Sequence, residues 1–77
     1  MWRLQRYFVT MEKMNVKVIK DENGTFLADP QHNYNVGIYG VGNSVEEALE
    51  DLRTVIDEAR EYCQTLPASS EIEFIIM

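Results

Sequence analysis

Few side chains in this sequence have catalytic potential, and none stands in a convincing catalytic arrangement. His32, the only histidine, lies in a polar stretch between Gln31 and Asn33, with no Ser or Cys at a spacing typical of a nucleophile and its base. Cys63 follows the last turn of a predicted helix, where a buried or unreactive thiol is more common than a nucleophile. We therefore expect neither a catalytic nor a metal-binding role for these two residues.

Asp21, Glu22 and Asp29 are the remaining chemical candidates, because a two-metal nuclease holds its ions roughly 4 Å apart between several carboxylates. Acids are expected at a turn such as the one that holds Asp21 and Glu22, and no further acid falls in the core of the predicted sheet. We expect no enzyme activity, no metal and no cofactor. Metal-dependent nucleolysis, lost on Asp21→Asn, stays an alternative hypothesis.

Charge is distributed very unevenly along the chain. Residues 1–20 carry five cationic side chains against Glu12, a net charge of +4, whereas residues 21–77 carry twelve acids against Arg53 and Arg60, a net charge of −10. The whole chain has a net charge of −6, which disfavours direct binding to nucleic acid because phosphates are bound by Lys and Arg. Such a dipolar molecule suits head-to-tail contacts, or an acidic face that meets a basic partner.

The size of the chain limits it to one domain. At 77 residues, a domain buries only about 60% of the surface that its unfolded chain exposes, so pairing with a copy or a partner would add stability. A single cysteine excludes an internal disulfide, which fits a reducing compartment. No apolar run approaches the roughly 20 residues that span a bilayer. We expect a cytoplasmic protein that does not associate with membranes.

One strongly capped acidic helix is the clearest predicted element. Ser44 and Glu47 have the spacing of a capping box, and Leu66-Pro67 stops any continuation. An apolar stripe with a 3.6-residue period predicts the face that packs on a sheet: Val45, Ala48, Leu49, Leu52, Val55, Ile56, Ala59 and Tyr62. The opposite face is acidic, and six of its residues are our candidates for partner binding: Glu46, Glu50, Asp51, Asp57, Glu58 and Glu61.

Four strands are predicted around this helix. Residues 16–20 and 25–28 form a hairpin, whose Asn23-Gly24 turn suits type I′ geometry because both residues tolerate positive φ. After a loop over residues 29–33, a third strand covers residues 34–41, where the glycines suggest a bulge or close packing under the helix. Residues 71–77 form the last strand. Its two apolar faces indicate burial on both sides or contact with another subunit.

The N-terminal segment, residues 1–13, allows two interpretations. Leu4, Tyr7, Phe8 and Met11 form a helical stripe, whereas residues 7–10 would equally suit a strand. Aromatic residues beside Arg3 also occur in nucleic-acid-binding arms, although packing on the body of the protein is more common. We predict a short helix or an irregular arm over residues 1–13 and a single domain over residues 14–77.

Over residues 15–77 the sequence resembles the HicB-like antitoxin family. That family's pattern is an acidic turn ending in Gly, an aromatic-x-Ala strand, a Pro-containing loop, and then Gly-Cys-x-x-x-Gly-x-Thr-x-Glu-Glu-Ala at the start of an amphipathic helix. The matching positions are Asp21-Glu22-Asn23-Gly24, Phe26-Leu27-Ala28, Gly37, Gly42, Ser44 in place of Thr, and Glu46-Glu47-Ala48. The sequence departs from the pattern at Ile38, which replaces Cys, and over residues 33–36, which replace Pro-Asp-Leu-Pro.

The resemblance implies an α+β fold of order β-β-β-α-β, described in that family as a partial ribonuclease-H fold. The expected form is a three-stranded antiparallel sheet, one long amphipathic helix packed on it, and a C-terminal fourth strand. It also implies an antitoxin, or an orphan protein of that type, that covers a small basic RNA-cleaving toxin and self-associates as a dimer or higher oligomer. Family members usually add a C-terminal DNA-binding segment that binds an operator. The sequence ends at its last predicted strand, so the resemblance does not imply operator binding here. The alternative is a structural or oligomerisation module that has no toxin partner.

Overall fold

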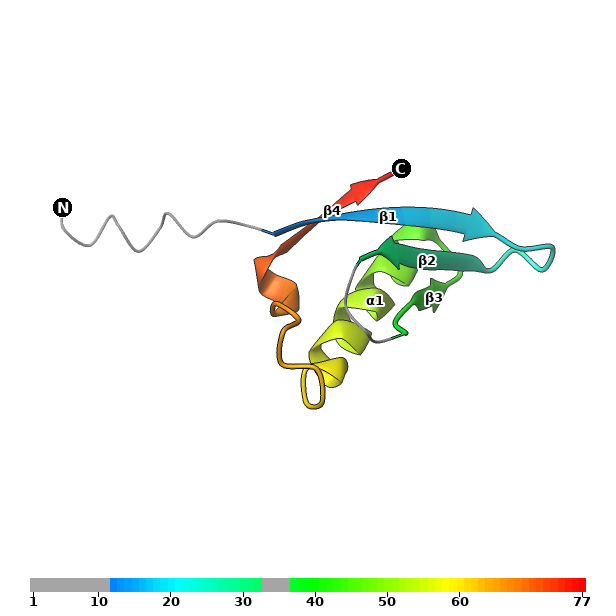
Figure 1. Ribbon diagram of the computed structural model, residues 1–77. Coiled ribbons are helices and arrows are strands. Elements are labelled where there is room, and N and C mark those ends of the chain that lie inside the picture. Colours follow the sequence, from blue (N-terminus) through cyan, green and yellow to red (C-terminus); the bar gives the residue numbers. More distant parts are fainter. Residues whose placement is uncertain (1–11, 33–36) are drawn as a thin grey trace, which may run out of the picture.

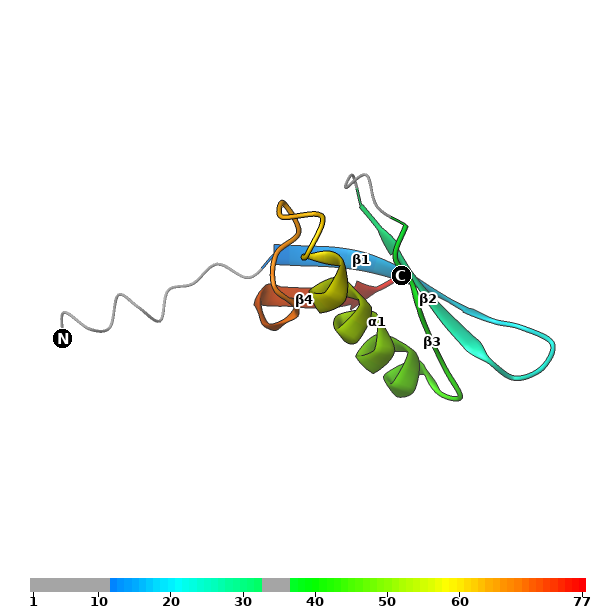
Figure 2. The ribbon, with the colours of Figure 1, turned by 90° about the horizontal axis from the view of Figure 1, so that it is seen from below.

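Four strands and one long helix make up the described part of the chain. The computed structural model describes residues 12–32 and 37–77. In chain order the elements are β1 (Glu12–Lys20), β2 (Phe26–Gln31), β3 (Gly40–Gly42), α1 (Val45–Ala59), the 3-10 turn η2 (Ser69–Glu71) and β4 (Ile72–Ile76). The strands form one sheet of order β3-β2-β1-β4, and α1 lies against one of its faces (Figures 1 and 2).

The predicted α+β class with one helix is confirmed, but the predicted three-stranded antiparallel sheet is wrong. The sheet is mixed and four-stranded: β2 is antiparallel to both β1 and β3, while β4 is parallel to β1. The reason lies in the β3-α1-β4 connection. A helical crossover carries the chain back to the end of the sheet at which the preceding strand began, so the strand that follows runs in the same direction as the strand before it.

The first hairpin forms as expected, although its turn is not of type I′. Asp21 and Gly24 close the turn through a bond from the Gly24 N–H to the Asp21 carbonyl at 3.2 Å. Gly24 has φ 82°, while Asn23 keeps a negative φ, which describes a type I turn followed by a left-handed glycine. The Asp21 carboxylate explains this geometry, since its Oδ1 accepts hydrogen bonds from the N–H groups of Asn23 and Thr25.

The third strand is much shorter than the predicted residues 34–41. β3 contains only Gly40–Gly42, and residues 33–36 of the prediction lie outside the described residues. Pro30 supplies the physical reason. Because Ala28 pairs with Gly40, continuing the ladder would set Ile38 opposite Pro30, which has no N–H to donate. Pro30, predicted in a loop, instead lies in β2 opposite Val16.

Two glycines of β3 allow α1 to approach the sheet backbone, as the close-packing interpretation expected. A Cβ on Gly40 would collide with the carbonyl oxygen of Ala48 and would lie 2.5 Å from the Leu52 nitrogen. At Gly42 an added Cβ would lie 2.5 Å from the Cβ of Glu47. Side chains at these two positions are therefore incompatible with the observed position of the helix.

The predicted helix cap at Ser44 is confirmed, although the reciprocal bond of Glu47 goes to the residue before the cap. Ser44 Oγ accepts a hydrogen bond from the Glu47 N–H at 3.1 Å, and the Glu47 carboxylate accepts one from the Asn43 N–H at 2.9 Å. Both bonds satisfy N–H groups near the helix start that have no partner within the helix. No helix in the described part of the chain is long and apolar enough to cross a membrane.

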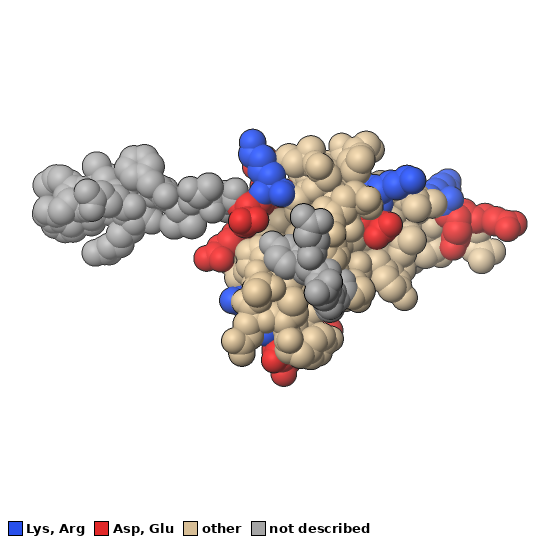
Figure 3. Space-filling view, in the orientation of Figure 1, with Lys and Arg blue, Asp and Glu red and all other residues tan. Residues whose placement is uncertain are grey.

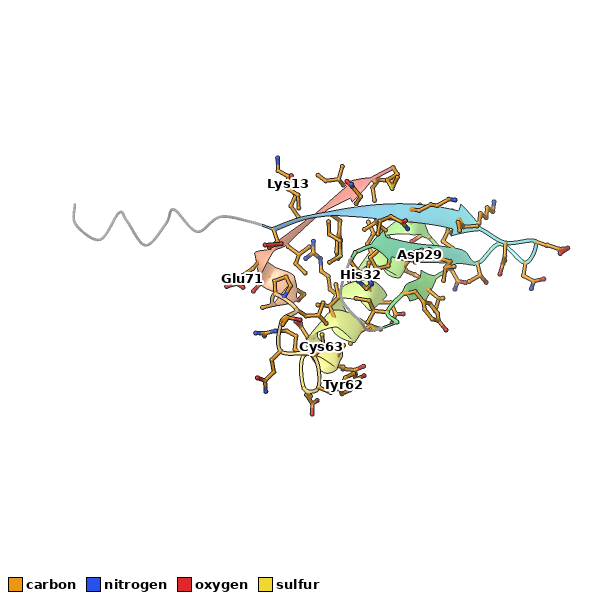
Figure 4. The ribbon with its side chains drawn as sticks, viewed as in Figure 1. Lys13, Asp29, His32, Tyr62, Cys63 and Glu71 are labelled. Carbon is orange, nitrogen blue, oxygen red and sulfur yellow. The ribbon has the colours of Figure 1, made fainter. Side chains whose placement is uncertain are left out.

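The predicted apolar stripe packs on the sheet except at its last position. Tyr62 is 78% exposed because α1 ends at Ala59, so its assignment to the buried face was wrong. Figure 4 shows Tyr62 beside the turn that follows the helix. The buried core between α1 and the sheet comprises Met14, Val16, Ala28, Ile38, Ala48, Leu52, Ile56, Ala59, Leu66 and Ile72.

The first strand begins earlier than predicted. β1 begins at Glu12, four residues before the predicted strand, so Glu12 and Lys13 belong to the sheet rather than to an N-terminal arm. Their pairing with Ile72 and Glu73 of β4 explains this extension. The rest of the predicted arm lies outside the described residues.

We predict that Leu52→Ala or Ile56→Ala lowers the free energy of unfolding by about 2–5 kcal/mol, because each removes a fully buried side chain from the interface of α1 with the sheet. A loss of that size is a large fraction of the stability of so small a domain. Urea denaturation followed by circular dichroism measures the change. A variant as stable as the wild type would contradict the packing described above.

We also predict that Gly40→Ala lowers the free energy of unfolding by about 1–3 kcal/mol or more, because the methyl group would meet the backbone of α1. Gly37→Ala is the matched control, since a Cβ there meets no atom within 4 Å. That variant should stay within about 0.5 kcal/mol of the wild type. Equal effects at the two glycines would show that α1 does not pack against β3 this closely.

Candidate protein-binding surface

The six acids predicted to bind a partner do not form one uniform surface. Asp51 is partly committed to the fold, because its Oδ2 accepts a hydrogen bond from the Val41 N–H at 3.0 Å. Val41 lies on β3, an edge strand, and this N–H points away from β2. The carboxylate thus satisfies an outward-facing donor of the edge, which hinders the addition of another strand there.

Asp57 is committed more fully, at the opposite end of the helix. Its two carboxylate oxygens accept hydrogen bonds from the N–H of Ser69 at 3.0 Å and from the Ser69 hydroxyl at 2.7 Å. These bonds, first the backbone N–H and then the hydroxyl, hold the pKa of Asp57 below its ordinary value of 3.8. Asp57 therefore stabilises the connection into η2, and both of its carboxylate oxygens are already hydrogen-bonded within the domain.

The other four predicted residues, Glu46, Glu50, Glu58 and Glu61, are exposed on or just after α1. Among residues 12–32 and 37–77, their carboxylates form no ion pair and accept no hydrogen bond. Glu46, Glu50 and Glu58 recur every four or eight residues, which puts them on one side of the helix. These four carboxylates are the acidic groups that remain available to a basic partner.

A first hollow, of about 350 Å³, lies between the outer face of α1 and the edge of β3. Glu47, Glu50 and Asp51 line it together with Val41 and Thr54. Glu47 and Asp51 each use one carboxylate oxygen for a bond to the backbone. A carboxylate has about four acceptor sites, so both can still accept from a further donor. The hollow suits a cationic side chain of a partner.

A second hollow, of about 440 Å³, lies on the other side of α1 and was not anticipated from the sequence. We call it the β4 groove, since it lies between α1 and edge strand β4. Its lining combines Glu46, Leu49, Glu50 and Arg53 of the helix with Ile72, Glu73, Phe74 and Ile76 of the strand. Apolar side chains bordered by charges are typical of protein interfaces.

Arg53 links the helix to the strand at the base of this groove. Its Nη1 donates to the Ser69 carbonyl at 2.7 Å and to the Ile72 carbonyl at 3.4 Å. The guanidinium group lies 4.4 Å from the centre of the Phe74 ring, a cation-π contact. Arg53 is thus held in place, and it contributes a positive charge to the lining of the groove.

The face of the sheet opposite α1 has a different character. Ile19 of β1, Leu27 of β2 and Val41 of β3 are paired across the strands and form an apolar row. Most of the basic side chains visible in Figure 3 lie along β1. Lys13, also on β1, points to the side away from α1 (Figure 4). Lys13 and Lys17 thus lie on the face opposite α1, together with the acids Glu73 and Asp29 that are paired with them across the strands.

The residues considered for catalysis do not come together around a reaction centre. Asp21 and Glu22 lie in the hairpin turn, Asp29 in β2 and His32 just after it, whereas Cys63 lies near the far end of α1 (Figure 4). Cys63 Sγ is 3.4 Å from Thr65 Oγ1. In the part of the chain that the structure describes, no three His, Cys, Asp or Glu side chains gather as ligands of a metal ion would.

The sequence carried a partial signal for the β4 groove. The alternation of residues 71–77 placed apolar side chains on both faces of the last strand, which indicated either burial on both sides or contact with another subunit. What could not be foreseen is that β4 joins the edge next to β1, and that Leu49 turns toward it from the border of the helix stripe. The periodicity of a single helix or strand predicts which of its faces is buried. It does not predict a groove that forms between two elements.

No protein-family model, curated protein or solved structure matches this chain. The resemblance to HicB-like domains therefore remains a prediction from short sequence motifs. The function has to be inferred from the surfaces described above.

The lowered pKa of Asp57 gives a prediction for stability against pH. A carboxyl whose pKa falls on folding stabilises the protein above about pH 4, and this contribution disappears as the pH falls through the lowered pKa. We predict that Asp57→Asn is less stable than Glu58→Gln at pH 7, and that the gap closes below pH 3.8. Both variants remove one charge from neighbouring positions, and urea denaturation from pH 2 to pH 7 compares them. A gap that is independent of pH would contradict the role given to Asp57.

Proposed function

We propose that this domain is a binding protein that neutralises a small basic RNA-cleaving protein, in the manner that its resemblance to HicB-like antitoxins implies. The observation that carries the proposal is the acidic outer face of α1, where Glu50 and Glu58 have no cationic partner among the described residues. The hollow beside β3 adds Glu47 and Asp51 to the same side. We call this set the acidic helix face.

The chemistry of such inhibition is direct. A small RNA-cleaving protein binds phosphates through Lys and Arg side chains. Carboxylates offer the same side chains charge-assisted hydrogen bonds, which for Arg can be bidentate. Occupying these cations with protein carboxylates blocks access of RNA without any chemical step by the inhibitor. Complementary charge also accelerates association and makes the complex sensitive to salt.

The second candidate function is a self-associating module with no toxin partner. The exposed apolar edge at β4 favours it, because such an edge pairs readily with another strand. The two functions use surfaces that share only Glu50, which lines both the hollow beside β3 and the β4 groove. They are therefore separable by experiment.

The test starts from the tagged chain in lysate of its native cell, followed by purification of any small basic protein that co-elutes. That protein is then incubated with RNA, with and without the chain added back. We predict that the partner alone cleaves RNA, that an equimolar amount of the wild-type chain stops cleavage, and that raising the salt from 50 mM to 500 mM weakens the complex.

The variants that test the surface are Glu50→Lys combined with Glu58→Lys, which reverse two charges on the acidic helix face. The matched control combines Glu22→Lys with Glu71→Lys, two exposed acids of the hairpin turn and η2 that change the net charge equally. We predict loss of inhibition only for the first pair. Equal loss of inhibition with both double variants would show that only net charge matters. Purification of the chain from lysate with no basic protein bound would refute the proposal in favour of the self-associating module.

A further inference from the structure

β4 is an edge strand that lacks the features by which proteins usually block edge pairing. It pairs with β1 on one side and has no strand on the other within the described residues. Its last two residues are exposed, Ile75 at 36% and Ile76 at 48%, and so is Met77, which follows the strand, at 71%. It contains one charged residue, Glu73, and no proline or bulge, whereas β3 at the other edge is short and has Asp51 on its outer N–H.

The free side of β4 offers main-chain hydrogen-bonding groups in a regular array. The Met77 N–H donates to the Val16 carbonyl at 2.9 Å, so residues 73, 75 and 77 direct their main-chain groups toward β1. Alternation along the strand then turns the main-chain groups of Phe74 and Ile76 outward. The Ile72 carbonyl also points outward, with only the 3.4 Å contact from Arg53.

We propose that the occupant of this edge is β4 of a second copy of the chain, paired antiparallel about Phe74. In this register Phe74 faces Phe74 of the second copy, and Ile72 faces Ile76 of the second copy. Phe74 is an outward-facing residue, so the central pair is a hydrogen-bonded one. The Ile72 N–H already donates to the Ser69 carbonyl, so about four main-chain bonds join the copies. Two four-stranded sheets then continue as one.

The side chains of β4 are self-complementary in this register on both faces. On the face of the sheet that α1 covers, the side chains of Ile72, Phe74 and Ile76 each meet an apolar side chain of the other copy. On the opposite face, Glu73 of each copy lies across from Ile75 of the other, so the two glutamates do not face each other. Like charges directly opposite destabilise a strand pair, and this pairing avoids them.

The charges around the β4 groove also become complementary. Asp57 bonds to Ser69 and Arg53 bonds to Ile72, so α1 runs antiparallel to the segment from η2 through β4. Arg53 therefore lies near the start of β4, and Glu46 lies near its end. A two-fold axis through the Phe74 pair brings Arg53 of each copy to the side of the groove that holds Glu46 of the other, which favours this arrangement over a parallel one.

The test uses opposite charges at one position. Ile75→Glu places a carboxylate across from Glu73 of the second copy, whereas Ile75→Lys places an ammonium group there. Within one chain the preference is the opposite: glutamate at position 75 is favoured over lysine. Residue 75 pairs with Asn15, which is flanked on β1 by Lys13 and Lys17. Sedimentation equilibrium should give the wild type twice the chain mass of 9.0 kDa. We predict a dissociation constant for Ile75→Glu at least about tenfold weaker than that for Ile75→Lys.

A second variant addresses the main chain. Ile76→Pro removes an outward N–H that makes no bond to β1, so the folded domain should persist by circular dichroism while dimerisation is lost. Amide hydrogen exchange in the wild type should show protection of the Phe74 and Ile76 N–H groups that increases with protein concentration. Equal dimerisation of Ile75→Glu and Ile75→Lys, or a monomeric wild type at 100 μM, would overturn the inference.

This inference does not depend on the function proposed above. A monomeric wild type that still stops RNA cleavage by a basic partner would overturn the β4 pairing alone. A dimer with the predicted response to the Ile75 variants, but with no basic partner, would refute the antitoxin proposal and leave the pairing intact.

Discussion

The close approach of α1 to β3 is the constraint on which the rest of the structure depends. Gly40 and Gly42 have no side chain, so the backbone of the helix lies directly on the strand, and the carbonyl of Ala48 occupies the space that a Cβ of Gly40 would need. This contact fixes the depth at which Leu52 and Ile56 enter the core. Within residues 12–32 and 37–77 the buried core lies at this interface, so the stability of a 77-residue domain depends strongly on how well the helix fits there.

The same contact divides the surface of the domain into parts with different chemistry. A helix held over β3 brings Asp51 to the Val41 N–H, which blocks that edge of the sheet. Its far end is held by Asp57 at Ser69 and by Arg53 at the start of β4, and these contacts leave the β4 groove open beside the free edge. The outward carboxylates then remain for a basic partner. One helix thus protects one edge, exposes the other and carries the acidic helix face.

Local signals in the sequence predicted what local interactions decide. Asn23-Gly24 marked the hairpin, Ser44 and Glu47 marked the start of the helix, and the 3.6-residue stripe identified its buried face up to Ala59. The errors arose where distant segments decide the outcome. The parallel position of β4 depends on the crossover, the length of β3 depends on Pro30 in another strand, and Asp51 and Asp57 find backbone donors ten and twelve residues away. A pattern of acids on a helix therefore predicts a charged face, but it does not tell which carboxylates the fold itself uses.

Binding through the acidic helix face can be mapped with backbone amide chemical shifts. The purified basic partner is added stepwise to the isotopically labelled chain, and the shift changes are recorded residue by residue. We expect the shifts to change along α1 around Glu50 and Glu58 and in β3 next to the hollow, while the shifts of Lys13 and Lys17 on β1 stay unchanged. Changes confined to the face of the sheet opposite α1, or no change at an equimolar ratio, would contradict binding through the acidic helix face.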